Sequence, residues 1–222
     1  MLQYSTIEFL KALKQNNHKA WFDENRKQYE YAKEDYLNLI DGIIRGVGKN
    51  DPTIALLQPK ECVFRINRDV RFSKDKSPYK TNFGAGFSKG GKKSLLSGYY
   101  FHCEPGSSFV GGGIWMPPAP ELKKVRQEID YNYTEFQAVL SNPLFKKQYD
   151  DLERGADTKL SRPPKGYDES NPAIEYLKLK SYIASAPISD EELTSKSLVS
   201  KVVEAFNALQ PLIYFINQAL EL

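Results

Sequence analysis

The sequence predicts an α+β fold in which a mainly antiparallel sheet is flanked by N-terminal and C-terminal helices. Three observations favour this fold: helical periodicity near both ends, alternation with a period of two in the middle, and a turn motif between two apolar runs. With 222 residues, the chain can bury a sizeable core. We expect a single domain over 1–222, with a helical start (1–50), a strand-rich core (60–117), and helices, a long loop and one further strand over 118–222.

Two apolar stripes predict the helices of the first 50 residues. Ser5 and Glu8 form a capping-box pattern, and Ile7, Leu10 and Leu13 recur at helical spacing. A second, longer helix is expected to begin near Asp23 and to end at Gly46 or Gly48. Its apolar positions are Tyr29, Tyr36, Leu37, Ile40, Ile43, Ile44 and Val47. Stripes of this kind predict surfaces that face a core.

From about Lys60 the apolar period changes to two, which predicts a strand. The apolar side of this strand holds Phe64, Ile66, Val70 and Phe72, and the polar side holds Arg65, Asn67, Asp69 and Arg71. Arg68 falls on the apolar side, so either a bulge resets the register or Arg68 points inward and is paired. We expect Arg68 to be at least partly buried and paired with Asp69, Glu104 or a bound anion.

Three further strands are expected in "KTNFGAGFS", "SGYYFHCE" and "SSFVGGGIWM", with a tight turn at Pro105-Gly106 between the last two. One face of this hairpin is expected to be the core face, with Phe101, Cys103, Val110, Ile114 and Met116. The other face would hold Tyr100, His102, Glu104, Phe109, Gly111, Gly113 and Trp115. Its glycines indicate either close approach of a ligand or chain segment, or aromatic side chains lying over them.

The rest of the chain is expected to be mostly helical after Pro117-Pro118, in "ELKKVRQEI" and "YTEFQAVLS". The polar stretch 153–172 is typical of a lid or binding loop and carries Arg162, Lys165 and Tyr167. A helix is expected to start at Pro172, and "LKSYIASAPIS" predicts a strand. Ser189 and Glu192 form a second capping-box pattern before a last helix that we expect to bend at Pro211.

Positive charge is concentrated in residues 65–80. Six basic residues face two acidic ones there, a local excess of four in a chain whose net charge is +3. Arginines on a strand suit carboxylate or phosphate groups, which predicts an anion site. The alternative is a solvated edge strand whose charges oppose aggregation. The spacing does not match a phosphate loop, whose glycines precede a helix.

Catalytic and metal motifs are sparse. Two His and two Cys residues exclude a multi-histidine metal site, a thiolate zinc site and a disulfide framework, so no metal is predicted, and no motif assigns a cofactor. His102 and Cys103 would point to opposite faces and cannot form a dyad with each other. His102 with Glu104 could act as an oriented acid–base pair, or His102 could be a hydrogen-bonded structural histidine. The sequence leaves open whether the protein is an enzyme.

The sequence favours a cytoplasmic protein. The N-terminus "MLQYSTIEFL" lacks the pattern of a signal peptide, and the run "PLIYFI" is far shorter than a membrane span. Two cysteines in a chain of this length fit a reducing compartment. We therefore expect no membrane partner, and no sequence feature indicates an oligomeric state.

Three segments together resemble domain of unknown function family 2461, a family of uncharacterised bacterial and fungal proteins. They are "INRDVRFSKDKSPYKTNFGAGF", the pair "GYYFHCEPG" and "GGGIWMP", and "LSRPPKGYDESNPAIEYLKLKSY". The resemblance covers nearly the whole chain and implies one domain. It implies no activity, cofactor or catalytic residue.

Two functions are compatible with the sequence. One is the binding of an anionic small molecule, phosphorylated or carboxylated, in a basic and aromatic pocket, with His102 and Glu104 as catalytic candidates if the protein is an enzyme. The other is a binding module for nucleic acid or a protein partner, although the small net charge predicts weak, salt-sensitive nucleic-acid binding. The candidate ligand-binding residues are Arg65, Arg68, Arg71, Lys74, Lys76, Tyr79, Lys80, Tyr100, Trp115, Arg162 and Lys165. We expect segment 65–80 and loop 153–172 to form one site.

Overall fold

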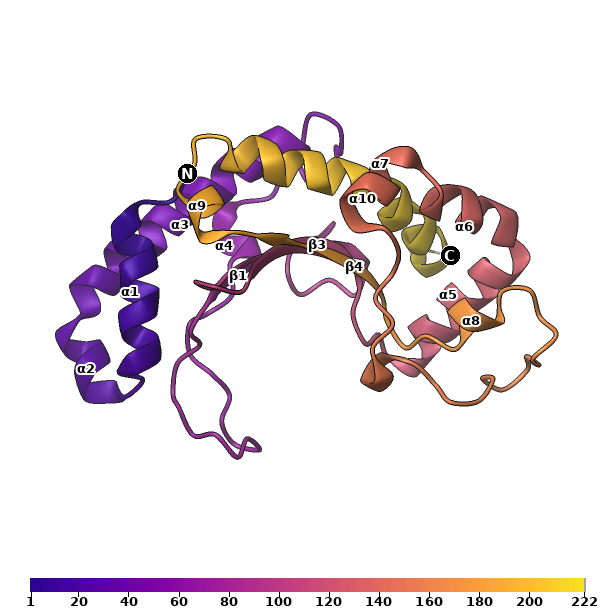
Figure 1. The fold of residues 1–222 in the computed structure, drawn as a ribbon, viewed down its shortest axis with the longest axis horizontal. Coiled ribbons are helices and arrows are strands. Elements are labelled where there is room, and N and C mark those ends of the chain that lie inside the picture. Colours follow the sequence, from indigo (N-terminus) through magenta and orange to yellow (C-terminus); the bar gives the residue numbers. More distant parts are fainter. Residues whose placement is uncertain (222) are drawn as a thin grey trace. The chain divides into compact units, whose positions relative to one another are not determined.

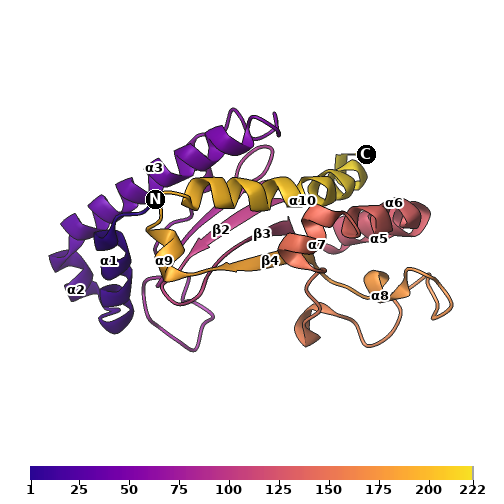
Figure 2. The same cartoon turned by 45° about the horizontal axis from the view of Figure 1, so that its top comes forward.

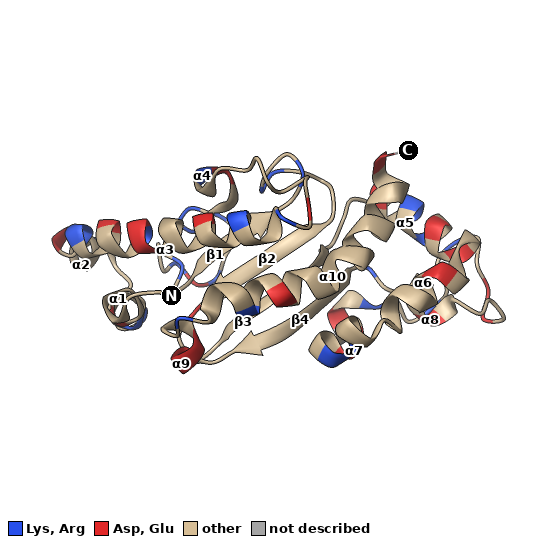
Figure 3. Ribbon diagram, turned by 90° about the horizontal axis from the view of Figure 1, so that it is seen from above, with Lys and Arg blue, Asp and Glu red and all other residues tan. Residues whose placement is uncertain are grey.

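The computed structural model describes residues 1–221, and Leu222, the last residue of the predicted helical end, lies outside them. The predicted α+β class is confirmed, with one four-stranded antiparallel sheet of order β1-β2-β3-β4 and helices before and after it in the chain (Figure 1). The strands are β1 (Phe83–Phe87), β2 (Gly98–Cys103), β3 (Ser108–Ile114) and β4 (Tyr182–Ile188). None of them contains a charged residue of either sign, as their uniform tan colour in Figure 3 shows.

The chain forms two compact units. Unit 1 consists of Met1–Lys92, Tyr100–Val110 and Pro187–Glu204, and unit 2 of Lys93–Tyr99, Gly111–Ala186 and Ala205–Leu222. The limits of the units fall within β2, within β3, within β4 and within the last helix, so each of these elements contributes residues to both units. The expected single domain stays a prediction.

Unit 1 contains the N-terminal helices. They are α1 (Tyr4–Gln15), α2 (Lys19–Glu24), α3 (Arg26–Val47) and α4 (Pro59–Cys62), followed much later by α9 (Asp190–Leu193) and the start of α10 (Leu198–Glu221). Helices α1 and α3 lie side by side in both Figure 1 and Figure 2. Helix α3 also packs closely on the start of α10, because a Cβ added at Gly46 would lie 2.5 Å from a methyl group of Val203.

The helix predictions for the N-terminal part are correct in type and partly wrong in their limits. Ile7, Leu10 and Leu13 are buried as expected, but Ser5 lies inside α1 and the N-cap is Gln3, which makes no side-chain cap. The expected helix from Asp23 is two helices separated by Asn25, and its expected end at Gly48 is confirmed.

The core of unit 1 lies between α3 and one face of the strands. The ring of Tyr36 stacks on Phe83 and Phe101, with centroids 5.1 and 6.1 Å away, and its hydroxyl donates to the Phe101 carbonyl at 3.3 Å. Cys103 and Val110 are fully buried on the same predicted core face. Burial raises the pKa of the Cys103 thiol, which makes its thiolate scarce at neutral pH.

The hairpin between β2 and β3 follows the prediction up to Ile114. The Ser107 amide donates to the Glu104 carbonyl at 2.8 Å, and Gly106 has a φ of 79°, which confirms a tight turn with glycine at the left-handed position. Ile114 is buried, but Met116 is 48% exposed, so its predicted place on the core face is wrong. Its φ of 42° shows that the extended backbone, and with it the alternation, has ended.

The strand glycines make room for the protein's own atoms. In unit 2, a Cβ at Gly111 would lie 2.5 Å from the Ala184 carbonyl oxygen, and one at Gly113 would lie 1.9 Å from that of Tyr182. In unit 1, a Cβ at Gly84 would lie 2.5 Å from the Tyr100 hydroxyl. At Gly111 and Gly113 the backbone of another segment of the chain approaches the glycine closely. At Gly84 the side chain of Tyr100 lies over the glycine.

The strand predicted from about Lys60 is wrong. Only isolated bridges are present, Val63 with Ala85 and Asn67 with Tyr79, and the chain between the latter pair forms a loop, here called the 67–79 loop. In Figures 1 and 2 this part of the chain extends away from β1. Phe72, expected on the core side, is 95% exposed. The physical reason is that side chains bind the loop backbone in place of a neighbouring strand, as the section on the site describes.

Unit 2 contains the helices after the hairpin and most of β4. They are α5 (Ala119–Tyr131), α6 (Tyr133–Leu140), α7 (Pro143–Tyr149), the short 3-10 helix η1 (Ala156–Thr158), α8 (Ile174–Leu177) and most of α10. Helix α10 contains Pro211, and the bend expected there stays a prediction. The predicted strand β4 and the capping box of Ser189 and Glu192, which lies in unit 1, are also confirmed. Within residues 1–221, none of the helices combines the length and apolar character that crossing a membrane requires.

Candidate functional site

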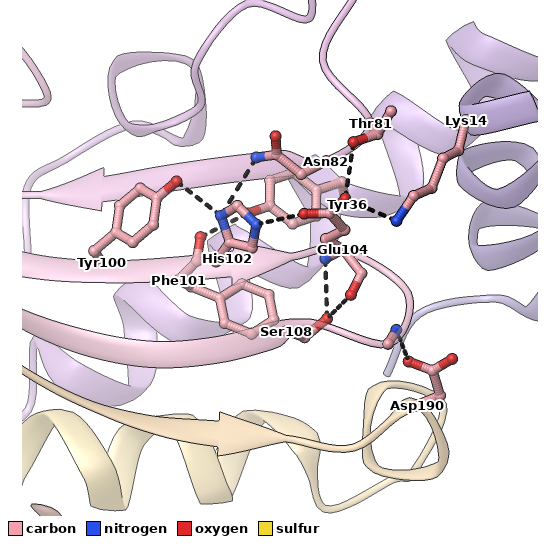
Figure 4. Close-up of polar contacts among 11 residues, drawn as sticks. Lys14, Tyr36, Thr81, Asn82, Tyr100, Phe101, His102, Glu104, Ser108 and Asp190 are labelled. Carbon is pink, nitrogen blue, oxygen red and sulfur yellow. Dashed lines mark hydrogen bonds and ion pairs between the residues drawn. The ribbon is translucent and has the colours of Figure 1, made fainter. Parts of the chain in front are cut away.

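A chain of hydrogen bonds runs along the face of β2 that points away from α3 (Figure 4). Tyr100, His102 and Glu104 are two residues apart, so their side chains share this face. The Tyr100 hydroxyl lies 3.2 Å from His102 Nδ1, and His102 Nε2 lies 3.3 Å from Glu104 Oε2. Asn82, just before β1, places its amide nitrogen 3.4 Å from Nδ1. We call these four residues with Thr81 the His102 cluster.

The geometry fixes the proton positions of the neutral imidazole. The ionised Glu104 can only accept, so Nε2 carries a hydrogen, and the Asn82 amide at 3.4 Å and the Tyr100 hydroxyl at 3.2 Å share the single lone pair of Nδ1. The ring stacks on Phe109, with centroids 4.7 Å apart and planes 13° apart, and the His102 side chain is only 17% exposed. Burial raises the pKa of Tyr100, which therefore stays a phenol at neutral pH.

Glu104 joins the cluster to α1 and to the segment before β1. Its Oε1 accepts from the Thr81 hydroxyl at 2.8 Å and lies 3.5 Å from Lys14 Nζ, while its backbone amide donates to Ser108 Oγ at 2.9 Å (Figure 4). Partial burial acts to raise the pKa of this carboxyl group, but the hydrogen bonds from Thr81 and His102 and the charge of Lys14 outweigh it. The net effect is a lowered pKa, so Glu104 is a carboxylate at neutral pH.

A polar recess of about 300 Å³ adjoins this cluster, and we call it the Lys80 recess. It shares Lys14, Thr81 and Asn82 with the contacts just described, and it also contains Arg68 and Lys80. The full lining is Lys14, Asn17, Arg68, Asp75, Ser77, Tyr79, Lys80, Thr81 and Asn82. Three cations thus surround the recess with one carboxylate among them, and hydroxyl and amide groups supply further donors. Such a lining is suited to an anion.

Arg68 is partly buried and paired, as predicted, but its partner is not one of those expected. The side chain is 26% exposed and forms an ion pair with Asp75. It also donates to the Ser77 carbonyl at 3.1 Å. The loop turns back on itself, since the Arg68 amide donates to the Pro78 carbonyl at 2.9 Å, and this places Asp75 closer than Asp69 or Glu104. Hydrogen bonds from Ser77 and then Arg68 lower the pKa of Asp75 to about 2.

Lys80 is a half-buried cation without a carboxylate partner within 4 Å among residues 1–221. Its ammonium group lies 5.6 Å from the centroid of the Phe64 ring, and its backbone amide donates to the Ile66 carbonyl at 2.8 Å. Burial, and then the charge of Arg65, lower the pKa of Lys80. An anion in the recess would offset both effects, because it supplies the counter-charge that this amine lacks.

Tyr79 and Asn17 hold the far side of the recess in place. Tyr79 is buried, and its ring stacks on Phe22 with centroids 3.9 Å apart. The Asn17 amide donates to the Tyr79 carbonyl at 2.9 Å and its oxygen accepts from the Tyr79 amide at 3.1 Å. Tyr79 therefore anchors the chain just before Lys80, and its predicted ligand-binding role rests on its position in the recess lining.

The other predicted ligand-binding residues lie outside the recess lining. Arg65, Arg71, Lys74 and Lys76 are exposed, and Arg71 forms an ion pair with Asp69. Tyr100 belongs to the His102 cluster. Trp115, Arg162 and Lys165 belong to unit 2, where all three are exposed, and their part in a site with segment 65–80 stays a prediction.

Six residues of the recess lining were not among the predicted site residues: Asp75 and Ser77, within the predicted segment 65–80, and Lys14, Asn17, Thr81 and Asn82 outside it. Lys14 looks like any exposed lysine in the last turn of a helix. Thr81 and Asn82 look like ordinary polar residues before a strand. No sequence signal distinguishes them, because their role follows from the approach of α1 to the end of β2. Within the described residues, no three His, Cys, Asp or Glu side chains gather as a metal ligand set would.

The chain was compared with known proteins in three ways. The family described as conserved hypothetical protein (DUF2461) matches residues 5–215, nearly the whole chain. No curated protein and no solved structure matches this chain.

Proposed function

The chain belongs to the conserved hypothetical protein family DUF2461, whose description states no activity, and we propose on the basis of the site that the protein binds an anionic small molecule in the Lys80 recess. The observation that carries this proposal is Lys80 itself. Burial of its ammonium group is unfavourable, and the charge of Arg65 adds to this cost, so an anion in the recess, which Lys14 and Arg68 also line, would stabilise Lys80. The ligand would carry a phosphate or carboxylate group, since ammonium, guanidinium, hydroxyl and amide donors all bind such oxygens.

If the bound molecule is also a substrate, the His102 cluster supplies the acid–base group. Hydrogen bonds at both ring nitrogens orient His102, from Tyr100 at Nδ1 and to Glu104 at Nε2. A paired carboxylate and imidazole beside an anion site suit proton transfer to or from the part of a ligand that extends beyond its anionic group.

Thermal stability in the presence of inorganic phosphate tests the binding proposal. A ligand that binds only the folded protein stabilises it by about 2.7 kcal/mol at 100 times its Kd, so the wild type should melt several degrees higher. Lys80→Met should remove most of this gain. Lys74→Met is the matched control, because Lys74 is an exposed lysine of the 67–79 loop outside the recess lining, and this variant should respond like the wild type.

Two outcomes contradict the proposal. If phosphate and citrate both leave the melting temperature of the wild type unchanged, the recess is not an anion site. If Lys80→Met gains as much stability from phosphate as the wild type does, the anion binds elsewhere.

The proposed site extends, as a further part of this proposal, to Arg162 and Lys165 of loop 153–172. Like charges converge only where an anion offsets their repulsion, and neither residue has a role in a core. In that case Arg68→Ala and Lys165→Ala should each remove most of the phosphate stabilisation, and the double variant should lose little more than either. An unchanged response of Lys165→Ala would limit the site to the Lys80 recess.

A second candidate function is supported by the 67–79 loop. Phe72 is 95% exposed and Arg71 lies 5.7 Å from its ring centroid, so a basic and aromatic tip is presented to solvent. Exposed aromatic and basic side chains together suit single-stranded nucleic acid, with bases stacked on the ring. Titration with a fluorescent single-stranded oligonucleotide should show weak binding that fades as salt rises and is lost in Phe72→Ala.

The control for this titration is Leu56→Ala, which removes an apolar side chain that is 88% exposed elsewhere in unit 1. Submicromolar, salt-resistant binding that depends on Phe72 and not on Leu56 would place the second candidate ahead of the first.

A further inference from the structure

Glu104 is the member of the His102 cluster that links His102 to the Lys80 recess, because its carboxylate contacts His102 and two residues of the recess lining. Its Oε2 faces His102 Nε2, while its Oε1 faces the Thr81 hydroxyl and Lys14 Nζ, both of which line the recess. The carboxylate therefore occupies two donors that a bound anion would also use. Any ligand in the recess has to share Lys14 and Thr81 with Glu104 or displace it from them.

The charges around the recess determine which ligand fits. Lys14, Arg68 and Lys80 are cations, Asp75 pairs with Arg68, and Glu104 contacts Lys14. When the partly buried Glu104 is counted, the excess is one positive charge, and Lys80 carries it; Arg65, whose charge also acts on Lys80, is exposed and outside the lining, so solvent screens it. A monovalent anion would neutralise this excess, whereas a divalent one would leave a net negative charge among partly buried groups, which is unfavourable.

His102 can supply the missing positive charge without moving. Imidazole ordinarily gains its proton between about pH 8 and pH 5, close to physiological pH. In the neutral ring Nδ1 accepts from Tyr100 and Asn82. When Nδ1 takes up a proton, the Tyr100 hydroxyl can rotate and accept from it, and the Asn82 amide turns so that its oxygen instead of its nitrogen faces Nδ1, while Nε2 continues to donate to Glu104.

The groups that face His102 favour its protonation when an anion is bound. Tyr100 faces it from β2 and Glu104 from the residue after β2, Phe109 stacks on it from β3, and Asn82 approaches from the segment before β1. Glu104 is the one charged group in contact with the ring among the described residues, and Lys14 lies behind Glu104. A ligand that draws Lys14 and Thr81 toward itself removes from Glu104 one cation and one hydroxyl donor, and protonation of His102, which already contacts Glu104, would restore a positive charge beside the carboxylate.

We infer that the Lys80 recess takes a divalent oxyanion, such as a phosphate monoester, together with one proton that is held at His102. This inference rests on the proposed function and narrows its ligand to dianions. It assigns Glu104 as the residue that couples the bound anion to the proton. A monovalent oxyanion would bind without the proton, because the recess already has one positive charge in excess.

Sulfate and nitrate are the probes, because neither changes its charge between about pH 5.5 and 8.5, whereas phosphate does. At constant ionic strength, the sulfate affinity of the wild type, measured by isothermal titration calorimetry, should fall as the pH rises, by up to about tenfold per pH unit for the uptake of one proton. Uptake of one proton per sulfate should appear as a dependence of the binding enthalpy on the ionisation enthalpy of the buffer. Nitrate binding should show no such dependence.

Variants of the two histidines and of Glu104 show which residue causes the pH dependence of sulfate binding. His102→Gln should bind sulfate with an affinity that no longer varies with pH. His18→Gln is the control, since His18 is the protein's other histidine; its ring accepts from the Trp21 amide at the start of α2 and does not line the recess, although the residue follows Asn17, which does. It should keep the pH dependence. Glu104→Gln, which removes the competing charge, should bind sulfate more tightly at high pH and without proton uptake.

An NMR titration of the His102 ring in the wild type gives a result that does not depend on any variant folding. Sulfate should raise the pH at which the ring titrates, and nitrate should not. The inference is overturned, with the proposed function intact, if sulfate binding depends on Lys80 but neither takes up a proton nor shifts the titration of His102. If sulfate and phosphate both fail to bind the wild type at any pH, the proposed function fails and the inference fails with it.

Discussion

At the residue scale, Glu104 does the most to connect the site. Its carboxylate contacts Thr81 in the segment before β1, Lys14 of α1 and His102 of β2. Its backbone amide donates a hydrogen bond to Ser108. A side chain with partners from three elements keeps one orientation, so it also fixes the side chains that it contacts. The neighbouring turn at Pro105-Gly106, which the sequence indicated, brings the end of β2 to this position.

Replacing Glu104 should change how stability depends on pH. The pKa of Glu104 is lowered in the folded state, so its contribution is fully present above the unfolded-state pKa of about 4.5 and is lost as the pH falls through the lower folded value. Glu104→Gln should therefore melt below the wild type at neutral pH, by an amount that corresponds to about 1 kcal/mol, and the difference should vanish near pH 3. Thermal melts at a series of pH values from 7 down through the unfolded-state pKa check that the difference shrinks as the pH falls. A difference that grows toward acid pH would contradict the lowered pKa.

At the element scale, α1 is held at its N-terminus by a residue far along the chain. Asp35 of α3 accepts from the Gln3 amide at 2.8 Å and from the Thr6 hydroxyl at 2.6 Å. The capping box expected from Ser5 and Glu8 is local, and it does not form, because Asp35 already supplies the acceptor for the first turn. A local pattern can thus predict that a helix is present and still assign its cap to the wrong residue.

Two substitutions distinguish the local from the long-range cap. Asp35→Ala should destabilise the protein by about 2 kcal/mol, because it leaves the buried Thr6 hydroxyl and the Gln3 amide without this acceptor. Ser5→Ala should change stability by less than about 0.5 kcal/mol, since Ser5 is exposed within the helix. Urea unfolding of both variants measures this. If Ser5→Ala lowers the free energy of unfolding more than Asp35→Ala does, the local cap at Ser5 is the one that stabilises α1.

At the scale of the whole molecule, the two compact units share continuous elements. Strands β2, β3 and β4 and helix α10 each contribute residues to both units. A strand or helix that unfolds in one unit loses the hydrogen bonds that continue it into the other. The expectation of a single cooperative domain therefore has a physical basis in the covalent continuity of these four elements.

Hydrogen exchange at increasing urea concentration tests whether the chain unfolds as one domain. The amides of α3 in unit 1 and α6 in unit 2 should become exposed in the same transition, with the same midpoint. Two midpoints, with one helix exchanging while the other stays protected, would show that the units unfold separately.

The sequence by itself determined the α+β class, the apolar faces of α1 and α3, the hairpin turn, the four strands β1 to β4 and the cap of α9. These follow from periodicity and local turn chemistry, which neighbouring residues carry. Only the tertiary structure decided that Arg68 pairs with Asp75, that Phe72 is exposed, and that Lys14, Thr81 and Asn82 join the site. The reason is that alternation can predict which residues share a face only where a neighbouring strand holds the chain extended, and between residues 67 and 79 side chains bind the backbone instead.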